Sequence, residues 1–326
     1  MRPSPSLLGV LLVVSGGLAQ ALASARDSAN VPLFADMRFR RGFLLSYPDS
    51  AMGRKVEAVL VGDAADGKPV WRLCQWSTKY SLADVICARS ANGDFVWENA
   101  GKRVVVGVGA SGNADLVLEI RGKAEYGDHV RRAGEPWPHL LVEQDATTIY
   151  RLSELAALEL DIDLRLVLFE DHLPAERFDP GLHAAQCQLF LIVRNVNRRS
   201  PDFNNFIWFG VPFFDSRHDI PPAYMAPDAG KSDASGKFIY TIAGGEVNTN
   251  PMKHRQWVHV RKDLLPYIRE GLAAANQRGY LKSANPADFA VVDMNLGWEI
   301  PGTYSAAIQI KNLDITARAH GGDIRP

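Results

Sequence analysis

The sequence predicts an all-β fold: a two-sheet antiparallel β-sandwich of the jelly-roll or lectin-like kind, with one packed helix. Three observations predict it. About twelve short strand-like runs follow one another after residue 55, helical spacing occurs in one long segment, and two runs alternate between apolar and polar residues. Such alternation places one side of a strand in a core and leaves its other side wet.

The clearest alternating segment spans residues 158–169. Its even positions are all apolar, and polar residues take the first odd positions, beginning with Glu159, Asp161 and Asp163. This pattern predicts a strand with one face in the core. The other predicted strands, in chain order, are residues 56–61, 70–76, 103–108, 115–121, 139–144, 186–195, 206–214, 237–243, 257–260, 289–292 and 305–316.

One helix is predicted near residue 270. Apolar residues recur at helical spacing from Leu264 to Ala275, and Gly279 marks the end. Asp263 is placed to cap the first turn, where Pro266 costs little. We expect this helix to lie across an edge of the sandwich or to close one end of it.

The first 25 residues have the layout of a secretory signal peptide. Arg2 precedes an apolar core at residues 7–14, and residues 23–25 form an A-x-A cleavage site. The apolar run is too short to span a bilayer, and no later stretch approaches the ~20 apolar residues of a spanning helix. We expect a secreted or periplasmic protein with no membrane span, in which residues 26–326 form a single β-sandwich domain. An uncleaved N-terminal anchor is the alternative.

Charge and cysteine content narrow the function classes. The formal net charge is −1, which provides no electrostatic basis for binding nucleic acid. An oxidising compartment would allow a Cys74–Cys87 disulfide, whereas Cys187 lies in an apolar strand pattern and is expected to be buried. The sequence lacks the signature motifs of serine hydrolases, zinc proteases and nucleotide-dependent enzymes.

One candidate for acid–base chemistry is the segment that begins at Trp137. On a strand, His139 and Glu143 share a face, and a His and a Glu held together can move protons on a sugar. We therefore predict His139 and Glu143 as catalytic residues and Trp137 as a substrate-binding residue. A satisfied polar pair at a strand end is the alternative.

A second candidate is the charged segment that follows the apolar run at 206–214. We predict Asp215 and His218 as catalytic residues, because His218 can transfer protons near neutral pH, and Arg217 as a clamp for a carboxylate. In the alternative, Asp215 and Arg217 pair with each other and fix the turn. No cofactor is expected, although Asp228 and Asp233 in the following loop would suit calcium.

The turn near the end of the chain supplies a third candidate. Trp298 is predicted to be a flat apolar platform for a sugar, with Glu299 beside it as a substrate-binding residue. This role requires an exposed indole, and burial of Trp298 in the core is the alternative.

The segment Glu159-Leu-Asp161-Ile-Asp163 resembles the E-x-D-x-E strand of laminarinase-type β-sandwich glycoside hydrolases. Period-two spacing places the three carboxylates on one face of a strand, as a glycosidase needs for its acid and its partner. The final acid is Asp163 where that family has Glu. The alternative is a solvated outer face, with Arg165 offsetting part of the charge.

These observations together predict a carbohydrate-active protein. One hypothesis is a polysaccharide hydrolase or lyase with its site on a concave sheet face. The alternative is a non-catalytic carbohydrate-binding or envelope structural protein, which would share the fold and the aromatic residues but lack converging carboxylates. In both cases the expected partner is a polysaccharide or oligosaccharide.

Overall fold

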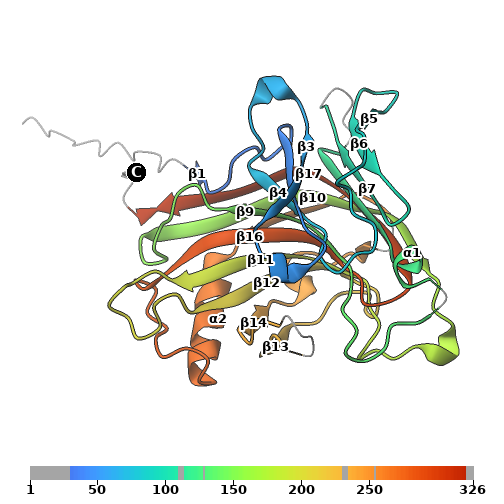
Figure 1. Ribbon diagram of the computed structural model, residues 1–326. Helices are drawn as coiled ribbons and strands as arrows, with labels where there is room; N and C mark the ends of the chain where they lie inside the picture. The colour runs from blue at the N-terminus through green and yellow to red at the C-terminus, as the bar shows by residue number, and fades with distance from the viewer. Residues whose placement is uncertain (1–29, 109–113, 128, 230–233, 253–254, 321–326) are drawn as a thin grey trace, which may run out of the picture.

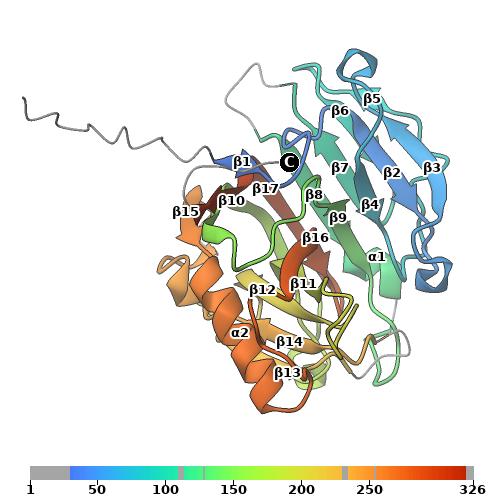
Figure 2. The same cartoon turned by 90° about the vertical axis from the view of Figure 1, so that its left-hand side faces the viewer.

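The computed structural model describes residues 30–108, 114–127, 129–229, 234–252 and 255–320, and it contains two stacked β-sheets (Figures 1 and 2). The fold class predicted from the sequence is confirmed. The expected signal peptide lies outside the described residues. In the part of the chain that is described, no helix is long and apolar enough to cross a membrane.

Sheet A has eight strands and is built around two long ones, β10 and β17, which pair antiparallel along most of their length. In spatial order its strands are β15 (Val258–Asp263), β10 (Leu155–Asp171), β17 (Tyr304–Ala319), β8 (Leu116–Arg121), β7 (Lys102–Val106), β6 (Phe95–Glu98) and β5 (Ala88–Arg89), and β1 (Val31–Pro32) also pairs with β17.

Sheet B has nine strands, antiparallel except where β14 pairs with β12 and β4 pairs with β2. In spatial order they are β13 (Tyr224–Pro227), β14 (Phe238–Thr241), β12 (Phe206–Asp215), β11 (Gln186–Asn195), β16 (Phe289–Glu299), β9 (His139–Asp145), β4 (Trp71–Cys74), β2 (Gly42–Ser46) and β3 (Val56–Val61).

One apolar core fills the space between the two sheets. Leu160 and Ile162 of β10 are fully buried, as are Leu189 and Leu191 of β11, and all belong to the same cluster. The polar residues that alternate with the buried ones in β10, beginning with Glu159, stay partly exposed, as the alternation predicts. Burial of each such aliphatic side chain stabilises the fold by about 1.5–3 kcal/mol, so the alternating strands hold the sandwich together.

The predicted helix is confirmed as α2 (Leu265–Gln277). Figure 2 shows it running beside β12 and β14, where it covers one side of the sandwich. Its buried residues include Ile268 and Leu272. Asp263 accepts a hydrogen bond from the backbone N–H of Leu265 at 3.0 Å. The other helical pieces are short: α1 (Gly122–Tyr126), η1 (Ser50–Met52), η2 (Ala64–Asp66), η3 (Ala175–Arg177) and η4 (Gly244–Glu246).

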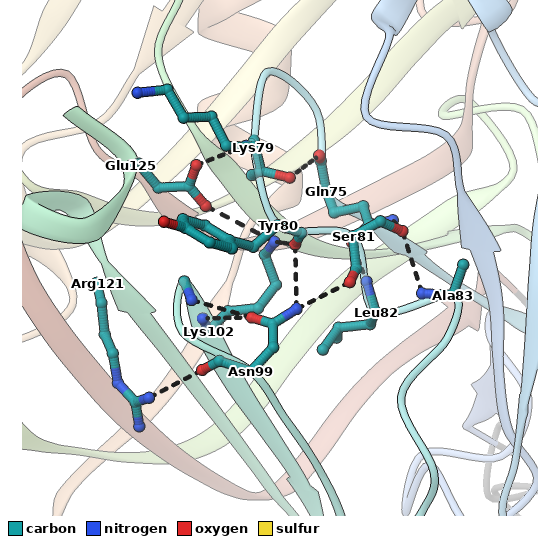
Figure 3. Close-up of polar contacts among 12 residues, drawn as sticks. Gln75, Lys79, Tyr80, Ser81, Leu82, Ala83, Asn99, Lys102, Arg121 and Glu125 are labelled. Atoms are coloured by element: carbon teal, nitrogen blue, oxygen red, sulfur yellow. Dashed lines mark hydrogen bonds and ion pairs between the residues drawn. The ribbon is translucent and has the colours of Figure 1, made fainter. Parts of the chain in front are cut away.

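A buried polar network supports the end of sheet A near α1 (Figure 3). The Lys102 side chain is fully buried, contacts the Tyr80 carbonyl oxygen and lies 3.8 Å from Glu125. Burial lowers the pKa of Lys102 to about 8 and raises the pKa of Glu125. Asn99 donates to the Ser81 carbonyl oxygen at 2.8 Å, which ties the loop after β4 to the β6–β7 turn.

Replacing Gly101 with alanine is expected to destabilise the protein by about 1–3 kcal/mol, because the site has no room for a methyl group. An added Cβ would lie 2.5 Å from Oε1 of Glu125 and 3.0 Å from Cβ of Tyr80. Urea denaturation measures the effect. Gly245→Ala is the matched control, since its Cβ would meet nothing closer than 4.0 Å. Equal midpoints for the two variants would contradict the prediction.

Candidate active site on the outer face of sheet B

The candidate site lies on the face of sheet B that points away from sheet A, which we call the outer face. Leu140 and Val142 of β9 are in the core, so the alternate residues of that strand point outward. Residues directly opposite one another in neighbouring strands share a face. Two rows therefore cross the outer face: Arg72, Glu143, Asn295 and Phe190 form one, and Asp145, Asp293, Ile192 and Trp208 form the next.

Three carboxylates of these rows gather around the guanidinium of Arg54, which follows η1. Both oxygens of Asp145 accept from Nη1 of Arg54 at 2.6 Å. Nη2 of Arg54 contacts Asp293 and lies 3.0 Å from Glu143. Arg72 approaches Glu143 from the other side, at 3.5 Å. We call these five residues the acidic cluster.

The environments of the three acids push their pKa values apart. Burial, with the nearby charge of Glu143, raises the pKa of Asp293 to about 8. Burial also raises the pKa of Glu143, against the opposing charges of Arg54 and Arg72. Burial acts in the same sense on Asp145, but its hydrogen bonds to Arg54 outweigh it and lower the pKa. At neutral pH the cluster therefore combines a protonated carboxyl group with an ionised one.

The acidic cluster also has hydrogen-bonding capacity to spare. Nη2 of Arg72 and Oδ1 of Asp293 are buried and make no hydrogen bond to any described residue. One is a donor and the other accepts or donates according to its protonation. A polar ligand that reached this depth would find both kinds of partner.

Cys74 lies beside the acidic cluster and is not part of a disulfide. Its Sγ is 3.7 Å from Oε2 of Glu143, and burial raises the pKa of this thiol well above its usual range. Cys74, Cys87 and Cys187 are all free thiols. The structure does not form the Cys74–Cys87 bridge that the sequence left open, because Cys74 faces Glu143 on the outer face, whereas Cys187 is buried as expected.

An aromatic group borders the acidic cluster on the outer face. Phe190 and Phe206 pack edge-on against Trp208, with ring centroids 5.9 and 5.4 Å away. Trp208 is partly exposed and donates through Nε1 to Ser235 at 2.9 Å. Ile192 lies between Trp208 and Asp293 in their row. The face thus places apolar plates beside the carboxylates.

The predicted residues His139, Trp137 and Glu299 form a second group at the other end of the outer face. Trp137 donates to Glu299 at 3.0 Å and stacks on His139, with centroids 6.0 Å apart. His139 lies 3.5 Å from the same Glu299 oxygen. His139 and Glu143 are four positions apart in β9, which corresponds to about 13 Å along the strand. The two predicted catalytic residues of this strand therefore share a face but belong to different groups.

Asp215 is the last residue of β12, and Arg217 and His218 follow it at the same end of the sheet. Asp215 accepts from Nε and Nη2 of Arg217 at 2.9 and 2.6 Å, and from Gln186 at 2.9 Å. Burial would raise the pKa of Asp215, but the hydrogen bonds from Arg217 lower it. Asp215 and Arg217 thus make the mutual pair that fixes the turn, while His218 is exposed.

The predicted platform role of Trp298 is corrected by its burial. Its side chain has no exposed surface, packs against Phe214 and donates from Nε1 to the Leu118 carbonyl oxygen at 3.0 Å. The physical reason is the length of β16, which continues through Trp298 to Glu299 instead of ending at Val292. Trp298 therefore points into the core and its neighbour Glu299 points outward.

The acidic stretch of β10 lies in the opposite sheet. Glu159 pairs with Arg261 at 3.1 Å, and Asp163 lies 3.0 Å from His259 and accepts from Asn312 at 2.7 Å. These carboxylates face outward from sheet A and are matched by neighbouring strands. They share neither a sheet nor a face with the acidic cluster.

Of the two residues suggested for calcium, the structure describes one. Asp228 accepts hydrogen bonds from the N–H and the hydroxyl of Ser235, both at 2.7 Å, and Asp233 lies outside the described residues. Where the chain is described, no group of three or more His, Cys, Asp or Glu side chains is arranged to hold a metal ion.

Sequence reasoning found only Glu143 of the acidic cluster and missed Asp145, Arg72, Asp293 and Arg54. A signal for Asp293 exists, because an acid in the middle of the apolar run that starts at Phe289 is unusual for a buried strand. No local signal marks Arg54, which lies in a turn and is 239 residues from its partner Asp293. Only the folded chain brings this side chain to the acids.

No protein-family model matches the chain, and no curated protein matches it in sequence. Three solved structures illustrate what it is similar to. An endoglucanase from Rhodothermus marinus is 12% identical, with 72% of this chain and 98% of that chain covered and a TM-score of 0.37. A family 12 xyloglucanase from Bacillus licheniformis is 10% identical, with 72% and 97% covered and a TM-score of 0.39. A family 11 xylanase from Neocallimastix patriciarum is 11% identical, with 71% and 94% covered and a TM-score of 0.36.

Proposed function

We propose that this protein hydrolyses glycosidic bonds of a polysaccharide at the acidic cluster on the outer face of sheet B. One observation carries the proposal: Glu143, Asp145 and Asp293 meet on the outer face of sheet B, where Asp145 is exposed and the other two acids are buried beneath Arg54, and their pKa values are pushed apart. Glycoside hydrolysis needs this combination, in which one carboxyl group is protonated and another is ionised.

Asp293 is the proposed general acid and Asp145 its ionised partner. With a pKa of about 8, Asp293 holds a proton at neutral pH and can give it to the departing glycosidic oxygen. Asp145 lies directly opposite Asp293 in the β9–β16 ladder. The two side chains are close enough to share a hydrogen bond, so their spacing lies nearer to the carboxyl spacing of about 5–5.5 Å in retaining enzymes than to the wider spacing of inverting ones. Asp145 therefore attacks the anomeric carbon, and water then releases the sugar.

Arg54 and Glu143 support this pair. Arg54 keeps Asp145 ionised through two hydrogen bonds, and its half-exposed side chain can adjust when a sugar arrives. The charge of Glu143 adds to the burial that keeps Asp293 protonated. Removal of Glu143 would lower the pKa of Asp293 and so weaken the acid.

The rest of the outer face supplies surface for the chain of sugars. Trp208 and Phe206 lie on one side of the acidic cluster, and Trp137 and His139 lie further along the same face. Aromatic rings offer flat apolar plates to the C–H faces of sugars. We propose the hollow side of the curved sheet B as the path of the polysaccharide. The proposal includes export by residues 1–25 and a single domain over residues 26–326.

The test is incubation of the purified protein with neutral β-linked glucans and xylans and with uronic-acid polymers. New reducing ends without unsaturated uronic products are expected, since a lyase would produce the latter. Asp145→Asn should abolish turnover. Glu159→Gln is the matched control, because Glu159 is an ion-paired strand acid of the opposite sheet and should leave turnover unchanged.

Two outcomes would contradict the proposal. Binding of a polysaccharide without any turnover would favour the alternative, a non-catalytic carbohydrate-binding protein. Loss of turnover in Glu159→Gln, with full activity in Asp145→Asn, would place the chemistry on β10 instead.

A further inference from the structure

Among the described strands, β3, β5, β13 and β15 lie at the ends of the two sheets, and the two-residue strand β1 pairs on one side only. β3 is the least protected of these five. β5 has two residues, and β13 has four and ends at Pro227. β15 carries His259, Arg261 and Lys262, charges of the kind that block pairing. β3 has six residues and pairs only with β2 among the described strands, and Figure 2 shows it as the outermost strand at one end of sheet B.

The free edge of β3 is also apolar. Val56, Val59 and Val61 are 40%, 48% and 55% exposed, so three of the large exposed hydrophobic side chains found in the described residues lie on this one strand. The strand has one acid, Glu57, which accepts from Gln75 at 2.9 Å and from Ser81 at 2.7 Å. Its carboxylate is therefore tied to its own sheet and does not shield the edge.

Extended backbone continues past the end of β3. The N–H groups of Gly62 and Asp63 donate to the carbonyl oxygens of Arg41 and Arg40, and Asp63 has extended dihedral angles. Charges flank the valines at equal spacing: Lys55 lies four residues before Val59 and Asp63 lies four residues after it. Asp63 also pairs with Arg40 of its own chain at 3.1 Å but keeps part of its side chain exposed. An antiparallel two-fold pairing places residue i opposite residue j and residue j opposite residue i.

We propose that β3 is a dimerisation edge, where a second copy of this chain adds its own β3 antiparallel and extends sheet B across a two-fold axis. With Val59 opposite Val59 of the second copy, Lys55 of each copy faces Asp63 of the other. The two Val59 side chains meet at the axis, and Val61 of each copy faces Glu57 and lies diagonal to Val59 of the other copy. Registers centred on Glu57 oppose like charges, which is unfavourable. The edge is thus self-complementary in both charge and apolarity.

The experiment is sedimentation velocity of the full chain across the micromolar range. The expected result is a reversible rise of the apparent mass to twice the monomer value. Val59→Lys, which sets two ammonium groups face to face at the axis, should keep the protein monomeric. Met225→Lys is the matched control, because Met225 is 40% exposed on β13, the other edge of sheet B, and should leave the dimer intact.

Charge reversal tests the register. Lys55→Asp and Asp63→Lys should each weaken the dimer, and the double variant should restore it, with far-ultraviolet circular dichroism confirming that every variant is folded. A constant monomer mass at all concentrations, a dimer that survives Val59→Lys, or growth beyond two copies would overturn the proposal. Failure of the double variant to recover the dimer would overturn the register.

Discussion

Replacing Asp293 with asparagine is expected to lower turnover by about 10²–10⁴-fold, the usual contribution of a positioned general acid. The amide keeps the shape of the side chain but has no proton to give at the required acidity. In the unaltered protein, activity should fall as the pH rises through about 8, because Asp293 then loses its proton. Initial rates of reducing-end formation between pH 4 and 9 measure both effects.

The same substitution should change how stability depends on pH. The folded state raises the pKa of Asp293 from its ordinary value of 3.8 to about 8, so it binds this proton more tightly than the unfolded chain does. The stability gained from that proton is complete below pH ~4 and is lost as the pH rises through about 8. Relative to the unaltered protein, Asp293→Asn should therefore become more stable as the pH increases over this range.

Asp215→Asn provides a control of opposite sign. Asp215 is also buried on sheet B, but Arg217 lowers its pKa, so its carboxylate stabilises the fold above the unfolded pKa and loses this effect in acid. Asp215→Asn should lose stability at neutral pH, and the loss should shrink as the pH falls below the ordinary pKa of 3.8 and through the lower pKa of the folded state. Thermal melts of both variants across pH measure the contrast. If the melting temperatures of the two variants changed with pH in the same way, the environments assigned to Asp293 and Asp215 would be wrong.

Replacing Trp298 with alanine is expected to destabilise the protein by about 3–5 kcal/mol, the range for truncation of a large aromatic side chain in a core. The indole has no exposed surface and fills the space between the sheets. The substitution also leaves the Leu118 carbonyl oxygen without its donor. Guanidinium denaturation gives the free energy of unfolding and its midpoint.

Trp208→Ala is the comparison for that experiment, since Trp208 is also a strand tryptophan of sheet B but lies partly exposed on the outer face. Its removal should cost much less stability and should weaken polysaccharide binding. If Trp208→Ala proved the more destabilising of the two, the assignment of inner and outer faces of sheet B would be wrong.

The strands could be predicted well where buried residues recur at a regular spacing along the chain. The alternating segment at Leu158 is β10, and the uniformly apolar run at Gln186 is β11. A strand buried on one face alternates between apolar and polar residues, whereas a strand buried on both faces is apolar throughout. β16 was predicted too short because Asp293 interrupts its apolar run. The short strands before residue 55, such as β2, carry too few residues for a period to show.

The candidate site could be predicted only in part. Glu143 and His139 were chosen for sharing a strand face, which a period of two determines locally. The acids that these two residues approach lie on β16, about 150 residues away in the chain. Asp293 lies near Glu143, and Glu299 lies near His139. The order of the strands in the sheet decides which residues become neighbours, and a local sequence pattern does not reveal that order.

By itself, the sequence determined which side chains lie inside and which face water along each strand, because the apolar period follows from backbone geometry and the hydrophobic effect. Tertiary structure alone decided which strands are neighbours, and with them which carboxylates meet. It placed Asp161 and its neighbours in sheet A beside His259 and Arg261 of β15, and it brought Arg54 over Asp145 and Asp293. The reason is that an acid's pKa depends on burial and on charges within a few ångströms, and strands far apart in the chain supply both.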